Sequence, residues 1–487
     1  MTKIEFPQSR CRIGVSRVDV TPPVGIYHRM WGAAKHDKAT GVHRPLTATV
    51  LAMSAETSSA ANPDAVFVAV DHCLLWYVEM AALLKVISDQ SGLPVDRITV
   101  FFSHTHAAGL MGLERIDLPG GELIPDYLES LGRKIGAAVN EAITTTQSAV
   151  INWGTGRCNL AANRDFFDPD RDHAVCGFNP QGTADDAVLV GRVQNAASGK
   201  SITTIVNYAC HPTTLAWDNT LISPDYPGAM REIVEDATKT PCFFIQGASG
   251  DIGPRDGFTG DVEVADRNGR QLGYAVLSAL EHMPPASTAL QYTGAVVSGA
   301  TIGTWQFADV DNQRQSDTAA WKFIATTVDI PYRSDLPDRE ELQRDRSAWL
   351  AKQDTATASG DTSAAADARA MAERMTRRLV RVEHLPVSES LPYPVRIWKL
   401  GDAIWLALDG ELYNILQRQL RETFPGVSIV VGTLANGSKA WYLPDSASYG
   451  KGLYQEDASV LAKGGLEQLL DFLVLQIRTM LPAPEFS

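Results

Sequence analysis

Two histidines separated by one residue, His104 and His106, directly follow an apolar run at 98–103 that predicts a buried strand. Side chains two positions apart in an extended chain lie on the same face, so both imidazoles would point in one direction. Such a pair could bind a metal ion or serve as catalytic acid and base. The same spacing also suits two hydrogen-bonded structural histidines, so the motif alone leaves these interpretations open.

A third histidine, His211, follows the strand-like run 202–210 and precedes Pro212, which has no amide hydrogen with which to continue a strand. A single histidine at a strand end is more often structural than functional. Two such histidine positions in one α/β sheet favour a functional site, because ligands of these folds gather beyond the carboxyl ends of strands.

Glu411 and Tyr442 complete the set of candidates. Glu411 comes after the strand-like run 403–408 and before a predicted helix, where its carboxylate could either stabilise the helix N-terminus or take part in a site. Tyr442 lies beyond the run 427–433 and its polar loop, and the residue type alone predicts only packing at an interface.

Other functional signatures are incomplete in the sequence. In the segment Gly-Ala-Ser-Gly-Asp at 247–251, Asp251 stands where a nucleophile elbow requires glycine. There is no H-E-x-x-H motif and no phosphate-binding loop, and the glycines do not complete a dinucleotide fingerprint. Acidic residues number 57 against 43 Lys and Arg, a net charge of −14, which disfavours nucleic acid and anionic lipid as partners.

The elements that must position these residues alternate between two periodicities. Short runs rich in Val, Ile and Phe alternate with amphipathic helical patterns, and several runs are apolar on both faces. This order predicts an α/β fold with mixed, largely parallel sheets flanked by helices. Residues 336–380, dense in charge and alanine, predict a projecting helical hairpin with a flexible link at 355–363, serving solvation or oligomer contacts rather than catalysis. The strand-like runs are 65–71, 98–103, 202–210, 242–246, 403–408 and 427–433.

The chain of 487 residues is 45% hydrophobic, which is typical of a protein with a large core. It has no apolar stretch of about 18 residues, so we expect no transmembrane helix. Its N-terminal residues lack the apolar run of a secretory signal peptide, and its six scattered cysteines predict free thiols. We therefore expect a cytoplasmic protein, and leave open whether it forms a homo-oligomer.

A series of strings follows in one order along the chain, of which D-x-T-P-P-x-G and H-T-H are the most specific. They are Ile13-Gly14, Asp19–Gly25, Val70-Asp71, Ser103–His106, Asn163-Arg164, Asn207–Pro212, Ile222–Gly228, Gln246-Gly247, Gly250-Asp251, and Gly410-Glu411 with the distal Tyr442. Together they resemble the N-terminal catalytic domain of the neutral/alkaline non-lysosomal ceramidases and their shorter bacterial relatives. The resemblance runs from about residue 11 to about residue 480. We therefore expect a single catalytic domain over 1–487, without a C-terminal immunoglobulin-like domain.

In that family the fold is α/β, and a buried zinc ion is held by two histidines, one glutamate and one tyrosine. The loop after Asn436 is out of step with the longer enzymes, so Tyr449 is the alternative for the tyrosine. The resemblance implies zinc as the cofactor and four ligands in this sequence, namely His104, His211, Glu411 and Tyr442.

Two further residues would line the same pocket as catalytic residues. By resemblance, His106 assists proton transfer or holds the tetrahedral intermediate, and Arg164 binds a polar or anionic part of the substrate. The alternative roles are a hydrogen-bond partner behind the site for His106 and a surface ion pair for Arg164.

The resemblance implies a zinc-dependent hydrolase that cleaves an amide bond of a small or lipid-like N-acyl substrate through activated water. An esterase or lactonase using the same site, or a non-catalytic binding protein that keeps the fold, are the alternatives. The longer ceramidases carry a serine where this chain has Gly253, so the substrate need not be ceramide. A long apolar tunnel would indicate a lipid, whereas a small polar cup with Arg164 would indicate a compact anionic amide.

Overall fold

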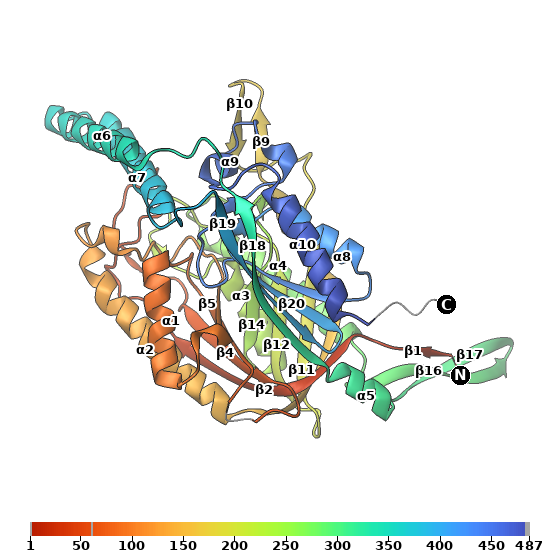
Figure 1. The fold of residues 1–487 in the computed structure, drawn as a ribbon. Helices are drawn as coiled ribbons and strands as arrows, with labels where there is room; N and C mark the ends of the chain where they lie inside the picture. Colours follow the sequence, from red (N-terminus) through yellow and green to blue (C-terminus); the bar gives the residue numbers. More distant parts are fainter. Residues whose placement is uncertain (1, 60–61, 483–487) are drawn as a thin grey trace.

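An eight-stranded sheet forms the centre of the computed structural model, which describes residues 2–59 and 62–482 (Figure 1). Its strands are β2 (Gln8–Asp19), β4 (Thr47–Ser54), β5 (Ala65–Val70), β6 (Ile98–Phe102), β7 (Gln147–Arg157), β11 (Ala187–Asn195), β12 (Ser201–Tyr208) and β14 (Cys242–Gln246). They are ordered β14-β12-β11-β7-β2-β4-β5-β6. The pairs at the two edges, β12–β14 and β5–β6, are parallel, and the pairs between them are antiparallel.

A second sheet, of four strands, packs face to face on the first. Its strands are, in order, β18 (Trp321–Pro331), β19 (Ser390–Leu400), β20 (Ala403–Leu408) and β22 (Ser428–Gly432), and the last pair is parallel. Aromatic side chains join the two sheets: the ring centroid of Phe67 lies 4.9 Å from that of Trp398 and 5.0 Å from that of Trp405. Rings of this size bury a large apolar area, so this interface is a major part of the core.

The mixed α/β architecture is confirmed, but the expectation of largely parallel sheets is wrong. A parallel pair needs a crossover long enough to hold a helix, whereas antiparallel neighbours can be joined directly. Each parallel pair described above has such a helix between its strands: α1 (Tyr77–Ser91) for β5–β6, α3 (Tyr226–Thr238) for β12–β14 and α8 (Asn414–Thr423) for β20–β22. Apolar runs indicate that strands are buried but not their direction, so the sequence pattern overestimated the parallel share.

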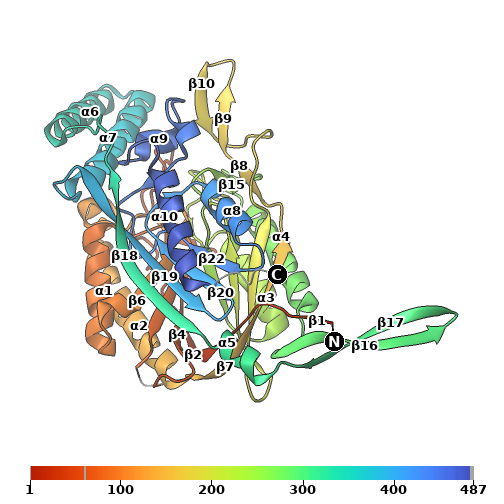
Figure 2. The same cartoon turned by 45° about the vertical axis from the view of Figure 1, so that its right-hand side comes forward.

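Helices cover the outer faces of both sheets and produce four layers (Figure 2). On the eight-stranded sheet, α2 (Ile124–Thr144) packs on β2 and β4 with α1 beside it, while α3 and α4 (Val262–His282) cover the other half. On the four-stranded sheet, α10 (Gly465–Met480) packs on β18, and α8 packs on β22. Across residues 2–59 and 62–482, none of the helices combines the length and the apolar character needed to cross a membrane.

The segment predicted to be a helical hairpin contains α6 (Arg339–Ser359) and α7 (Thr362–Glu383), which extend from one end of the molecule (Figure 1). The link predicted to be flexible is largely helical, because α6 continues to Ser359 and the turn is made at Gly360, with φ of +77°. Helix α7 is tied to the rest of the protein, and its Arg369 forms a salt bridge with Asp37.

A β-hairpin that the sequence interpretation did not anticipate extends far from α6 and α7 (Figure 2). It consists of β16 (Thr288–Ser298) and β17 (Ala300–Asp309), and β1 (Lys3–Ile4) pairs with β16. The remaining elements are short: β3 (Gly41–Val42), β8 (Ala161–Asn163), β9 (Asp165–Asp168), β10 (His173–Cys176), β13 (Leu221–Ile222), β15 (Ile252–Pro254), β21 (Glu411–Leu412), β23 (Tyr442–Leu443), α5 (Asn312–Thr318) and α9 (Tyr454–Ala458).

Candidate metal centre and its pocket

The ends of three strands bring two histidines and a glutamate together. His104 follows β6, His211 follows β12, and Glu411 follows β20. Each of these strands belongs to one of the parallel pairs. One ligand atom from each of the three side chains lies within 4.8 Å of the other two, and all three residues are buried. Side chains far apart in the sequence therefore form one compact donor cluster.

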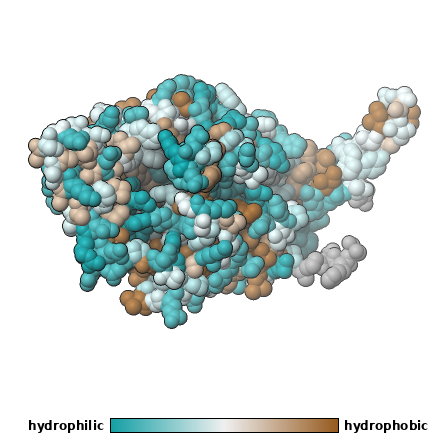
Figure 3. Space-filling view, turned by 90° about the horizontal axis from the view of Figure 1, so that it is seen from above, coloured by the Kyte–Doolittle hydropathy of each residue, from teal (hydrophilic) through white to brown (hydrophobic). Residues whose placement is uncertain are grey.

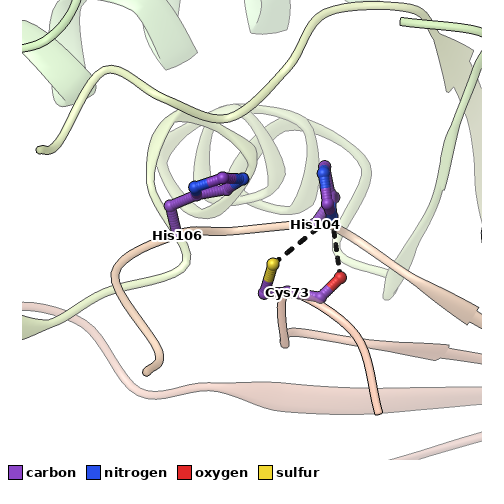
Figure 4. A group of neighbouring side chains, drawn as sticks. All are labelled: Cys73, His104 and His106. Carbon is purple, nitrogen blue, oxygen red and sulfur yellow. Dashed lines mark hydrogen bonds between the residues drawn. The ribbon is translucent and has the colours of Figure 1, made fainter. Parts of the chain in front are cut away.

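The backbone at His104 departs from the strand that the sequence predicted. β6 ends at Phe102, and His104 has φ of +67°, in the left-handed region that residues other than glycine rarely adopt. The predicted alternation of His104 and His106 along one strand face is therefore wrong. Their rings still approach each other, edge to face at 84° with centroids 5.0 Å apart (Figure 4). Strained backbone of this kind is concentrated at functional sites, where the surroundings hold it in place.

Hydrogen bonds determine which ring nitrogens of the two cluster histidines are free. His104 Nδ1 lies 2.8 Å from the carbonyl oxygen of Cys73 (Figure 4), and His211 Nδ1 lies 3.2 Å from that of Ser249. A carbonyl oxygen can only accept, so each Nδ1 donates, and a neutral ring then has its lone pair on Nε2. The two Nε2 atoms lie 3.0 Å apart. Two lone pairs at this distance repel each other unless a proton or a cation lies beside them.

Glu411 adds a negative charge at the same point. Its Oε2 lies 3.2 Å from His104 Nε2 and 3.6 Å from His211 Nε2, and it is buried without a hydrogen-bond partner among the described residues. Leaving a buried carboxylate oxygen without a partner is costly. Imidazole nitrogens combined with a carboxylate oxygen are a donor set that zinc binds. The residues present therefore fit a zinc ion.

The electrostatic surroundings agree with a cation site. Burial, followed by the charges of Arg164 and His104, lowers the pKa of His211 well below its ordinary value. Burial alone would raise the pKa of Glu411, but the charge and hydrogen bond of His104, with Tyr442 and Arg164, together outweigh it and the pKa is lowered. Burial also opposes a charge on His104, yet the thiol and carboxylate beside it raise its pKa. A bound cation takes the place of the proton that His104 and Glu411 would otherwise share.

Arg164 and Tyr442 lie next to the cluster. β21 and β23 pair in parallel with Glu411 opposite Tyr442. Arg164 is buried, and its Nη2 donates to the Tyr442 hydroxyl at 3.0 Å and to the Gly250 carbonyl at 2.7 Å. The alternative of a surface ion pair for Arg164 is therefore wrong. Burial and the charge of Glu411 raise the pKa of Tyr442 well above its ordinary value, and Arg164 opposes them.

His106 also reaches the cluster, whereas Tyr449 does not line the cavity. His106 Nε2 lies 3.1 Å from His211 Nε2, and its ring packs against that of Trp31 with centroids 5.2 Å apart. The Tyr449 hydroxyl donates to the carbonyl of Leu461 at 2.9 Å. Of the two tyrosines considered as ligands, the structure thus places Tyr442 next to Glu411.

Two members of the cluster, His104 and Glu411, line a cavity of about 420 Å³, and His211 is fully buried. Viewed from above, the surface is hollowed beside the α6–α7 hairpin (Figure 3). The lining is mainly aromatic, and sequence reasoning missed it, because its members are scattered along the chain without a local pattern. The missed lining residues include Trp31, Trp76, Trp217, Phe258, Trp441 and Tyr454, together with Cys73 and Arg377. Arg377 belongs to the hairpin that the charge pattern had assigned to solvent.

Gly253, which replaces the family serine, lies beside the cluster. A Cβ atom at Gly253 would lie 3.7 Å from His211 Cβ and 3.8 Å from Arg164 Cδ, which are ordinary van der Waals contacts. A serine would therefore fit at this position without displacing its neighbours, and the chain leaves that space unfilled.

Comparisons with known proteins bear on the fold and the family of the chain. No curated protein matches the chain. Among solved structures, it is similar to neutral ceramidase from Pseudomonas aeruginosa, with a TM-score of 0.63 and 14% identity over 98% of this chain and 76% of that one. It is likewise similar to a ceramidase complexed with C2, with a TM-score of 0.62 and 14% identity over 99% of this chain and 77% of the other. These likenesses show a shared fold. The family model for neutral/alkaline non-lysosomal ceramidase, N-terminal, matches residues 11–256, and the chain therefore belongs to this ceramidase family.

Proposed function

We propose that this protein is a zinc-dependent amidohydrolase that cleaves the amide bond of an N-acyl substrate. The observation that carries the proposal is the meeting of two imidazole Nε2 atoms with a partnerless carboxylate oxygen in a cavity. Membership of a ceramidase family supports an amide as the bond that is cleaved. The volume of the cavity lies within the range of small-molecule sites.

The residues of the cluster divide between holding the ion and handling protons. His104, His211 and Glu411 would hold the zinc, and Tyr442, which pairs with Glu411 across β21 and β23, would be the fourth ligand. When bound, zinc polarises the acyl carbonyl and lowers the pKa of water. His106, whose Nε2 reaches the cluster, takes the proton from the attacking water and returns it to the leaving nitrogen.

Arg164 would stabilise the negative charge that develops on the acyl oxygen. Its guanidinium is buried and held in place by the Gly250 carbonyl, so it is oriented before the substrate arrives. A preorganised donor in a cavity of low dielectric stabilises such charge more strongly than water does. The same guanidinium donates to the Tyr442 hydroxyl and therefore links the two sides of the site.

Metal analysis is the first test of this function. We expect the full-length protein, purified without chelators, to contain about one equivalent of zinc, since the cluster provides ligands for a single ion. Removing the metal should abolish hydrolysis, and adding zinc back should restore it. Mass-spectrometric metal analysis combined with assays on matched amide and ester substrates measures both. Full activity with less than about half an equivalent of metal, or activity on esters alone, would contradict a zinc amidohydrolase.

The two tyrosines provide a second test. Tyr442→Phe should lower kcat/KM by about tenfold or more, because it removes the hydroxyl beside Glu411 that can bind the ion. Tyr449→Phe is the matched control and should leave kcat/KM within about twofold, because its hydroxyl is bonded to the Leu461 carbonyl. Steady-state kinetics on both variants decides the matter. If Tyr449→Phe proved the more damaging change, the assignment of Tyr442 would be wrong.

A further inference from the structure

The five arginines of α7 fall into two groups according to their partners. Arg369, Arg374 and Arg378 each form a salt bridge with an aspartate. Arg377 and Arg381 lie four residues apart, one turn of the helix, and form no salt bridge with any carboxylate of the described chain. The three paired arginines share two aspartates, Asp37 and Asp457, whereas the other two have no counterion within salt-bridge distance in the described chain.

Arg377 lines the cavity and has N–H donors that no hydrogen bond within the described residues uses. Its Nη1 donates to the Met30 carbonyl at 3.1 Å, which is its one hydrogen bond within the described residues. Arg377 lines the same cavity as His104, His106 and Glu411. Its guanidinium can therefore contact a ligand that is bound in this cavity.

Arg381 lies behind the cavity wall. Its guanidinium carbon is 4.4 Å from the ring centroid of Trp441, which lines the cavity. Arg381 is 7% exposed, and its Nε is buried without a hydrogen-bond partner in the described chain. Burial lowers its pKa. Arg377 thus lines the cavity directly, whereas Arg381 packs against Trp441 of its wall.

The cavity carries an excess of positive charge. Among its lining residues Glu411 is the sole carboxylate, whereas Arg164 and Arg377 are both cations. Glu411 is occupied with the cluster, and a zinc ion would add two more positive charges. The chain as a whole has a net charge of −14, so this cavity is a local exception that favours an anionic ligand.

Three aromatic rings form an apolar wall in the same cavity. Trp217 and Phe258 stack at 22° with centroids 6.4 Å apart, and Trp31 meets both of them edge-on. Rings arranged in this way give the cavity an apolar side that can pack against a compact apolar or aromatic group.

Building on the amidohydrolase function, we propose that the substrate is a compact N-acyl amide bearing a carboxylate. The carboxylate binds Arg377, and the apolar part packs against Trp31, Trp217 and Phe258. Hydrolysis adds water across the C–N bond, so that the acyl carbon gains the hydroxyl, the nitrogen gains the proton, and an acid and an amine are released. An uncharged lipid amide would leave the guanidinium of Arg377 desolvated without a partner.

The test compares amides that differ in charge, on the full-length zinc-loaded protein. N-acetyl-phenylalanine carries its carboxylate on the amine part, N-succinyl-phenethylamine carries it on the acyl part, and N-acetyl-phenylalaninamide is neutral. We expect at least one anionic amide to be cleaved with kcat/KM about tenfold or more above that of the neutral amide. Whichever anionic amide is cleaved shows whether the substrate carries its carboxylate on the amine part or on the acyl part.

Arg377→Met should abolish this preference by raising KM for the anionic amide about tenfold or more, with kcat/KM for the neutral amide within about threefold of the parent. Arg374→Met is the matched control on the same helix, because Arg374 is exposed and pairs with Asp457. It should keep the preference. Carboxylate recognition would be wrong if Arg377→Met lost kcat/KM equally on the anionic and the neutral amide. It would also be wrong if the parent cleaved ceramide faster than either anionic amide. Neither result would contradict the amidohydrolase function.

If the parent protein cleaves neither these amides nor ceramide, the proposed amidohydrolase function is wrong. A binding measurement then tests separately whether Arg377 recognises a carboxylate. The probe is 3-phenylpropionate, which has the carboxylate and the ring but no bond to cleave. Calorimetry should show the parent and Arg374→Met binding it about tenfold or more tightly than Arg377→Met, both with and without zinc. Equal affinities for all three proteins would reject Arg377 as the carboxylate site.

Discussion

Replacing Glu411 by glutamine should strip the protein of zinc and lower kcat/KM for its amide substrate by about 10³-fold or more, while leaving it folded. The carboxylate is the single negative charge among the three cluster side chains, and its Oε2 faces the Nε2 atoms of His104 and His211. A glutamine presents a neutral oxygen or an amide donor there. The amide donor would hydrogen-bond to the imidazole lone pairs directly. The cation would then have neither a negatively charged ligand nor free imidazole nitrogens to bind.

Two measurements on Glu411→Gln and one control variant separate this account from simple unfolding. Metal analysis should show less than about a tenth of an equivalent of zinc. The metal-free variant should resist denaturant at least as well as the metal-free parent, because a buried carboxylate without a partner has been removed. Glu79→Gln is the control, since Glu79 is also buried but does not line the cavity. Full zinc content and activity in Glu411→Gln would remove this residue from the site.

Replacing Arg231 by methionine should lower the free energy of unfolding by about 3–5 kcal/mol, the largest loss of stability expected from a single change outside the site. Arg231 on α3 donates to Asp71 at the end of β5 through two bonds, 2.8 Å to Oδ1 and 2.5 Å to Oδ2. Asp71 is 1% exposed. The variant would leave this carboxylate buried without its counter-charge, and the amide and hydroxyl of Thr47 would be its remaining donors.

Denaturant unfolding of the parent and the variants measures this effect. Adding Asp71→Asn to Arg231→Met should recover a large part of the loss, because the unpaired charge is then gone. Arg267→Met removes an exposed arginine that pairs with Asp256, and it should change stability little. A double variant that is less stable than Arg231→Met would show that the loss comes from packing rather than from the stranded carboxylate.

The residues at strand ends were the part of the candidate site that the sequence could predict. His104, His211 and Glu411 each follow an apolar run, and polar side chains directly after buried strands are a signal that the sequence shows. Local patterns of this kind survive folding, because strand formation depends on neighbouring residues. The family strings added the roles that the pattern could not assign, and the family model confirms the membership.

The path of the backbone at these ends was not predictable. Alternation would have placed His104 and His106 on one face of a strand, but the chain turns at His104 with φ of +67°. Tyr442 is brought beside Glu411 by pairing between two-residue strands, which are too short to leave a periodic signal. Strand direction was not predictable either, because an apolar run of residues occurs in buried strands of both parallel and antiparallel sheets.

The sequence by itself determined the alternating α/β elements, the strand-end positions of His104, His211 and Glu411, and the two helices of the hairpin, because each depends on residues close together in the chain. The family resemblance, not the local pattern, implied which residues are ligands. Only the tertiary structure decided what the hairpin does. Its charge pattern predicted an arm for solvation or oligomer contacts, yet three arginines of α7 pair with Asp37 and Asp457, and Arg377 lines the cavity. These aspartates lie 79 to 332 positions from their arginines in the sequence, so no local pattern could have revealed the pairing.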